Sequence, residues 1–170
     1  VSRSYAAVWA DQPGQNYTAQ AVYIISGRVR TPSGAAVGGV TVTYAGTYNG
    51  GTAYGGSANT NTSGYYEFGV PGGWTGTASA AKTNYIVTTP AKSYTNVSAD
   101  MANEDYTAVA AVIITGYVKT AMRVGVANVV LTATGGYSGT SNGAGYYSVT
   151  VPSGWSGTLT PALAGYTFIP

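Results

Sequence analysis

The feature that most constrains the fold is a long internal repeat. Residues 4–27 align without a gap on residues 93–116, and twelve of these 24 positions are identical. The similarity continues downstream, where the Gly-Tyr-Tyr triplet at 64–66 recurs at 145–147. A repeat of this length indicates two tandem copies of one small domain, each with its own hydrophobic core.

The composition favours strands over helices. Gly (25 residues), Tyr (16 residues) and abundant Thr, Ser and Val are typical of β-structure with tight turns, and no segment has helical periodicity. We therefore predict an all-β chain of two tandem immunoglobulin-like or prealbumin-like antiparallel sandwiches. Residues 1–21 are expected to form an N-terminal donor-strand segment, residues 22–110 the first sandwich, and residues 111–170 a second, incomplete sandwich.

Alternating residues predict which side chains face the core. A period of two places Ile25 and Val29 on one face of the first strand, and Tyr66 and Val70 on one face of a later strand. Residues 46–63, which lie between these strands, are rich in Gly, Asn and Thr and predict a long loop.

Several runs in the chain resemble a known family. ISGRV, PSGAAVGGVTVT, SGYYEFGVPGGWTGT, SYTNVSAD and EDYTA are similar to the carboxypeptidase-regulatory-like, or prealbumin-like, sandwich repeat of prokaryotic surface proteins. The resemblance covers nearly the whole chain, as one full copy and one truncated copy. It implies a fold rather than a chemistry. It also implies a role as a stalk, a spacer or an adhesive module.

The composition argues against catalysis, nucleic-acid binding and membrane insertion. Only 7% of the residues are charged, and a net charge of +2 is too weak to attract nucleic acid or an anionic membrane. No apolar run approaches the roughly 20 residues that span a bilayer. Without histidine or cysteine, nucleophilic triads and most transition-metal sites are excluded. We expect no enzyme activity, no cofactor and no metal ion, in a protein that works outside the cell or at its surface.

The second copy of the repeat is expected to be open. It stops at the point that corresponds to residues 84–90 of the first copy, and therefore has no counterpart of the strands that follow there. An unpaired edge and an apolar groove invite aggregation unless another strand covers them. The residues expected to line this groove are Ile114, Val118, Val129, Leu131, Tyr147, Val149, Trp155, Tyr166 and Phe168.

A copy of the absent strands precedes the first domain. The residues expected to enter the groove are Tyr5, Val8, Trp9, Tyr17, Ala19 and Ala21. Intramolecular closure is sterically poor, because a sandwich roughly 35 Å long separates this segment from the second domain. Head-to-tail closure is open-ended. The sequence thus predicts a homopolymer, a pilus-like extracellular filament joined by donor-strand complementation, with other filaments or surface glycans as candidate further partners.

Two other functions fit the sequence. One is a segment of a repetitive cell-surface stalk or adhesin, in which the next repeat follows on the same chain. The other is a carbohydrate-binding accessory module, which predicts that Trp74 or Trp155 is exposed for stacking on sugars. The recurrence of these tryptophans after the same Pro-x-Gly turn favours a structural role instead.

Three asparagines are candidate acceptors for N-linked glycans. Asn16, Asn61 and Asn96 each begin an Asn-x-Ser/Thr triplet. Asn61, in the expected long loop, is the best placed of the three. Such triplets also arise by chance in a chain rich in Asn and Thr.

Overall fold

The computed structural model describes residues 3–89 and 91–169, and these residues form only strands and loops. The all-β fold class is therefore confirmed. Residues 1 and 2 of the expected segment 1–21, residue 90 of the expected domain 22–110 and residue 170 of the expected domain 111–170 lie outside the described residues. The strands are β1 (Val22–Arg30), β2 (Thr41–Tyr48), β3 (Thr52–Asn59), β4 (Tyr65–Pro71), β5 (Trp74–Ala81), β6 (Tyr85–Val87), β7 (Lys92–Val97), β8 (Tyr106–Tyr117), β9 (Val130–Ala133), β10 (Tyr137–Thr140), β11 (Tyr146–Pro152) and β12 (Leu159–Ala162).

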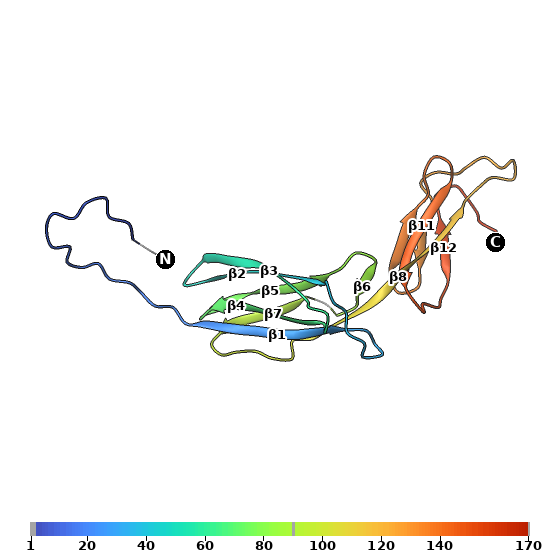
Figure 1. Ribbon diagram of the computed structural model, residues 1–170. Coiled ribbons are helices and arrows are strands. Elements are labelled where there is room, and N and C mark those ends of the chain that lie inside the picture. Colours follow the sequence, from blue (N-terminus) through green and yellow to red (C-terminus); the bar gives the residue numbers. More distant parts are fainter. Residues whose placement is uncertain (1–2, 90, 170) are drawn as a thin grey trace.

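The first domain is a sandwich of two sheets. One sheet has the order β3-β2-β5-β7, and in the other β1 lies between β4 and β8, with β6 paired to β8 (Figure 1). Ile25 and Val29 of β1, and Tyr66 and Val70 of β4, are all buried between the sheets, as their alternation predicts. Most ladders are antiparallel, but β1 and β8 pair in parallel.

The second domain repeats this framework with fewer strands. Its sheets are β10-β9-β12 and the pair β8-β11. The β8–β11 register, in which Ile114 lies opposite Val149, matches the β1–β4 register, in which Ile25 lies opposite Phe68. The sequence repeat is therefore a structural repeat.

A single strand joins the two domains. The first residues of β8 pair with β1 and β6 of the first domain, while its residues 111–117 pair with β11 of the second. No loop interrupts the strand at the junction, so the backbone ladder continues from one domain into the next (Figure 1).

The prediction of a long loop at residues 46–63 was wrong. Residues 52–59 form β3, an edge strand that pairs with β2 from Thr41 opposite Asn59 to Tyr48 opposite Thr52. The Asn and Gly residues serve the turn, where Asn49, Gly50 and Gly51 all have positive φ. Glycine in the strand also permits close packing, since a Cβ on Gly55 would lie 2.5 Å from the carbonyl oxygen of Tyr44.

Candidate functional site

The first domain is closed by one segment of its own chain, residues 92–110, which we call the closing segment. Its first arm is β7, which extends the β5 sheet and places Tyr94 opposite Gly76 and Val97 opposite Trp74. Tyr94 and Val97 are both buried in the core. This arm therefore completes one of the two sheets.

The second arm of the closing segment enters the opposite sheet. Tyr106, at the start of β8, is buried, pairs with Val29 of β1, and donates a hydrogen bond of 2.8 Å to the carbonyl oxygen of Ala78. Ala108 is buried beside it and pairs with Val87 of β6. The closing segment thus contributes to both faces of the core.

Between the arms, side chains and backbone tie the closing segment to β1. The Asp100 carboxylate accepts a hydrogen bond of 2.8 Å from the backbone N–H of Ile24, and the Asp105 carboxylate accepts one of 2.7 Å from that of Arg28. The Tyr66 hydroxyl donates to the carbonyl oxygen of Glu104. All three acids of this region thus have structural roles, since Glu104 also pairs with Lys92.

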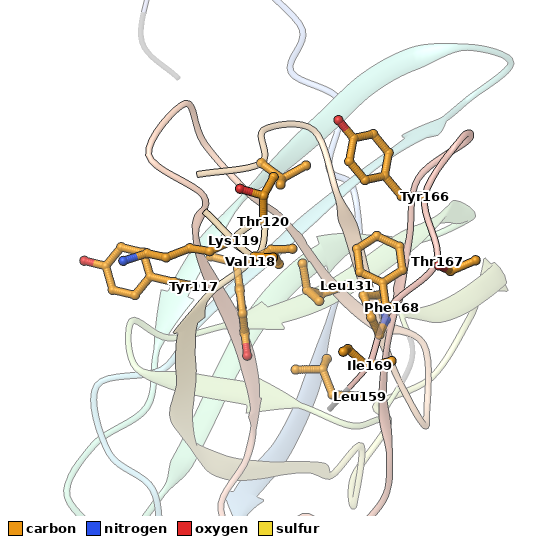
Figure 2. Close-up of a pocket in the computed structure, with 14 residues that line it drawn as sticks. Tyr117, Val118, Lys119, Thr120, Leu131, Leu159, Tyr166, Thr167, Phe168 and Ile169 are labelled. Atoms are coloured by element: carbon orange, nitrogen blue, oxygen red, sulfur yellow. The ribbon is translucent and has the colours of Figure 1, made fainter. Parts of the chain in front are cut away.

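The second domain has a groove where the first holds its closing segment. The groove has a volume of about 700 Å³ (Figure 2). By the repeat, three of its lining residues, Val118, Tyr147 and Leu159, correspond to Val29, Tyr66 and Ala78, which surround Tyr106 in the first domain. Its lining residues are Tyr117, Val118, Lys119, Thr120, Ala121, Val126, Leu131, Tyr147, Leu159, Pro161, Tyr166, Thr167, Phe168 and Ile169.

Backbone next to the groove is left without strand partners. The β5 strand begins at Trp74, whereas its counterpart β12 begins only at Leu159, so residues 155–158 are outside any strand. Residues 166–168, which correspond to β6, are likewise outside any strand. In the first domain both stretches pair with the closing segment.

The tyrosine at the floor of the groove occupies part of the open space. A Cβ on Gly116 would lie 2.6 Å from the Tyr147 hydroxyl, whereas a Cβ on Gly27, its counterpart, would lie 2.4 Å from the carbonyl oxygen of Glu104. The Tyr147 side chain therefore covers Gly116 where the closing segment covers Gly27. Its ring must move before any closing backbone can enter.

The N-terminal segment, residues 3–21, repeats the closing segment but is not buried against either domain. All its residues are exposed, including Tyr17 at 63% and Trp9 at 95%. Near its end, the Gln20 side chain donates a hydrogen bond of 3.1 Å to the carbonyl oxygen of Gly72. Figure 1 shows the segment leaving one end of the first domain while the second domain lies at the other end. An exposed apolar segment of this kind is typical of an interaction site.

The structure brings most of the expected groove residues into the second domain's core. Five of them line the groove, namely Val118, Leu131, Tyr147, Tyr166 and Phe168. The other four, Ile114, Val129, Val149 and Trp155, belong to the hydrophobic core beneath it. Leu159 was missed, although the repeat aligns it with Ala78, whose carbonyl oxygen binds Tyr106.

The two tryptophans of the repeat are structural. Trp74 has no exposed surface, and a Cβ on Gly76 would lie 2.4 Å from its ring. Trp155 is half-buried, and its indole N–H donates a hydrogen bond of 2.9 Å to the carbonyl oxygen of Thr134. The Trp74 ring is therefore closed to sugar stacking, and the Trp155 indole is held against the β9 end of the sheet by Thr134.

The three sequon asparagines are exposed. The Asn61 side-chain oxygen accepts hydrogen bonds from the backbone N–H groups of Ser63 and Tyr65, which fixes the turn between β3 and β4. The backbone N–H of Asn96 donates to the Thr75 hydroxyl. Asn16 lies in the N-terminal segment. Glycosylation at these positions stays a prediction.

Other kinds of site find no support in the described part of the chain. Residues 3–89 and 91–169 contain no cluster of three or more His, Cys, Asp or Glu side chains that could hold a metal ion. The same residues contain no helix that could cross a membrane.

Comparisons with known proteins give no identification. No protein-family model and no curated protein matches the chain. A solved structure, that of the Bacillus anthracis TIE protein, matches 87% of this chain at 13% identity and a TM-score of 0.40. The match covers 30% of that protein's chain. We therefore base the functional proposal on the geometry of the chain itself.

Proposed function

We propose that this chain is a structural subunit of an extracellular, pilus-like filament and has no enzymatic activity. The N-terminal segment of one copy enters the open groove of the next, where it takes the place that the closing segment holds in the first domain. Tyr17 then lies where Tyr106 lies, and Tyr5 where Tyr94 lies. One observation supports the proposal most directly. The residues that surround Tyr106 in the first domain have counterparts in the second domain, and these counterparts line a groove that no described residue fills.

The position of the segment favours a second copy over the same chain as the source. The N-terminal segment leaves the first domain at the end remote from the second domain (Figure 1), which carries the groove. Its exit strand β1 is held by seven residue pairs with β4, which fixes the exit direction. A contact between two different surfaces of identical copies repeats without closing, and therefore builds a filament.

Donor insertion also restores hydrogen bonds to exposed backbone. In the first domain, the closing segment pairs with β5, β1 and β6. The matching backbone in the second domain, at residues 155–158 and 166–168, has no such ladder. Strand addition at an exposed edge is a common mode of protein association, because the main-chain bonds supply affinity and alternate side chains supply specificity.

A repetitive cell-surface stalk is the second candidate. The uninterrupted strand β8 between the domains favours it, since the same junction suits a string of covalently linked repeats. In that case the groove is filled by the following segment of the same longer protein. The two candidates predict different behaviour for the isolated chain, which assembles into filaments only under the first.

Electron microscopy of the purified chain tests the proposed function. The full chain is compared with a variant that lacks residues 1–20. Filaments from the full chain and monomers from the deletion are the expected result. Monomers from both proteins, with equally stable second domains, would leave the stalk as the better description.

A further inference from the structure

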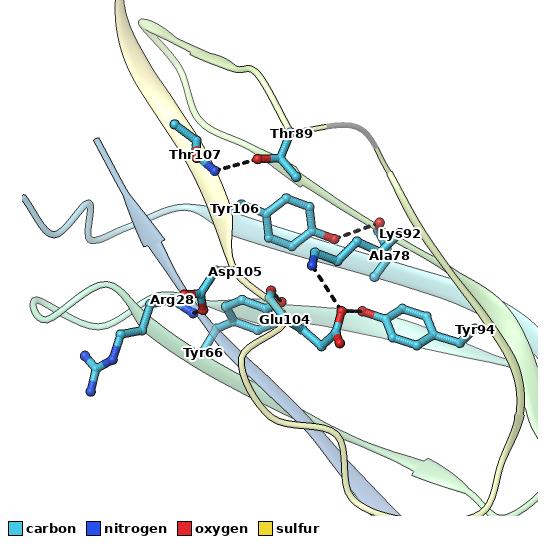
Figure 3. Close-up of polar contacts among 10 residues, drawn as sticks. All are labelled: Arg28, Tyr66, Ala78, Thr89, Lys92, Tyr94, Glu104, Asp105, Tyr106 and Thr107. Carbon is cyan, nitrogen blue, oxygen red and sulfur yellow. Dashed lines mark hydrogen bonds and ion pairs between the residues drawn. The ribbon is translucent and has the colours of Figure 1, made fainter. Parts of the chain in front are cut away.

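The closing segment of the first domain is held together by a polar cluster between its arms. The Glu104 carboxylate accepts hydrogen bonds from the Lys92 ammonium group at 3.1 Å and from the Tyr94 hydroxyl at 3.2 Å (Figure 3). The Lys92 nitrogen also lies 5.5 Å from the centroid of the Tyr106 ring. Figure 3 shows these side chains meeting between the two arms.

The free N-terminal segment already contains the same cluster. The Gln15 side-chain oxygen accepts hydrogen bonds of 2.9 Å from the Arg3 guanidinium and 2.9 Å from the Tyr5 hydroxyl. Arg3 lies 5.3 Å from the centroid of the Tyr17 ring and also donates a bond of 2.8 Å to the carbonyl oxygen of Asn16. Arg3, Tyr5, Gln15 and Tyr17 align with Lys92, Tyr94, Glu104 and Tyr106, so every contact except the Arg3–Asn16 bond has its counterpart.

One backbone position between the arms has the same left-handed conformation in both segments. Gly14 has a φ of 77°, and Asn103, its counterpart, has a φ of 64°. Left-handed backbone at this point reverses the chain just before the second arm, and only Gly and Asn adopt it readily. The unbound segment therefore shares this left-handed position with the closing segment.

We propose that the N-terminal segment docks on a second copy of the chain as a preformed clasp. Its two arms are the stretches that correspond to β7 and to the start of β8 in the closing segment. Their spacing is set before binding by the contacts among Arg3, Tyr5, Gln15 and Tyr17. The inference rests on the proposed function, because it takes the open groove of that copy as the partner. The arms must reach two sheets that pack about 10 Å apart, so their spacing decides whether both enter together.

A preformed clasp lowers the entropy loss of docking. Ordering a flexible segment of this length opposes binding strongly, and a segment held in its bound shape avoids part of that loss. Gln15 is the positioning residue, since it accepts from both Arg3 and Tyr5. Its replacement opens the clasp without removing an apolar contact with the groove.

The experiment uses the full chain and three substitutions. Gln15→Ala removes the shared acceptor, Gln15→Glu restores the residue of the first domain, and Gln12→Ala is a matched control outside the cluster. Light scattering follows filament elongation, and we expect Gln15→Ala to slow it about tenfold. Gln15→Glu and Gln12→Ala should elongate like the unchanged chain. Equal rates for Gln15→Ala and the unchanged chain would overturn the proposal.

A second readout does not depend on assembly. Nuclear Overhauser contacts of Gln15 with Arg3 and Tyr5 are measured in monomers that carry Gly116→Ala, which blocks the groove. The contacts are expected in this parent and absent after Gln15→Ala, and their absence from the parent would contradict the clasp. If the unchanged chain forms no filaments while the contacts are present, the proposed function and the docking fail, and only the preformed shape of the segment is supported.

Discussion

At the scale of single residues, two equivalent glycines distinguish a closed domain from an open one. A Cβ on Gly27 would meet the Glu104 carbonyl, which is fixed backbone, while a Cβ on Gly116 would meet the Tyr147 hydroxyl, the far end of a flexible side chain. The same substitution therefore has different consequences in the two domains. In the second domain, we expect alanine at position 116 to be tolerated in the monomer and to clash only when the backbone of a donor segment is inserted.

Gly116→Ala should abolish filament formation and leave the monomer folded. We expect the unfolding free energy of the second domain to change by less than about 1 kcal/mol, because the close contacts are all with the outer end of the Tyr147 side chain, which can move. Gly27→Ala is the matched control and should destabilise the first domain by about 1–3 kcal/mol through overpacking. Electron microscopy and denaturant unfolding check both variants. Filaments from Gly116→Ala would be inconsistent with an inserted donor backbone at this point.

The buried tyrosines of the first domain predict alkaline lability. Desolvation raises the pKa of Tyr66, Tyr94 and Tyr106 above the usual value of 10.0, to about 12 for Tyr106, and the nearby Glu104 charge adds to each shift. The folded state therefore holds these phenolic protons more tightly than the unfolded chain does. Their contribution to stability is fully present below about pH 10 and falls as the pH rises above it, and that of Tyr106 is lost as the pH passes through about 12. Circular dichroism across this range checks it, and constant stability to pH 12 would count against it.

At the scale of strands, the repeat predicts the framework but not every element. The hydrophobic alternation around Ile25 and Tyr66 is a local property of the sequence, so the strands and their buried faces follow from it. The edge strand β3 does not, because its Gly and Asn residues have turn chemistry and only pairing with β2 makes it a strand. The parallel pairing of β1 and β8 joins segments distant in sequence, and local patterns carry no information about it.

Assembly should extend three strand regions at once. Residues 17–21 correspond to residues 106–110 at the start of β8 and should extend β1 in the same way. Residues 156–158 and 166–168 should gain the ladders that their counterparts form with the closing segment in the first domain. Hydrogen–deuterium exchange should therefore slow in these three regions on filament formation. The edge strand β3 serves as the internal control and should exchange equally in monomer and filament. Unchanged exchange at residues 17–21 would rule out their insertion.

At the scale of the whole molecule, the chain places a donor and an acceptor at opposite ends of an elongated body (Figure 1). The strand β8 shows how one domain leads into the next without a loop, and β1 leaves the N-terminal segment in the same way. We expect the joint between subunits to copy the joint inside a subunit. The repeat predicts this arrangement, whereas the clasp and the position of Tyr147 depend on contacts in three dimensions that the alignment does not contain.

A disulfide designed across the joint tests the central claim most directly. In the first domain Ile86 of β6 lies opposite Val109 of β8, and the repeat assigns these places to Thr167 and Gln20. Side chains directly opposite in a ladder have Cβ atoms about 5 Å apart, which is near the range for a disulfide. Because the chain has no cysteine, Gln20→Cys and Thr167→Cys introduce the only thiols. After mild oxidation, denaturing electrophoresis of the double variant should show a ladder of covalent multimers. Each single variant has one cysteine per chain and should form no covalent species larger than a dimer. A double variant that remains monomeric, or that forms only an internal disulfide, would contradict head-to-tail insertion.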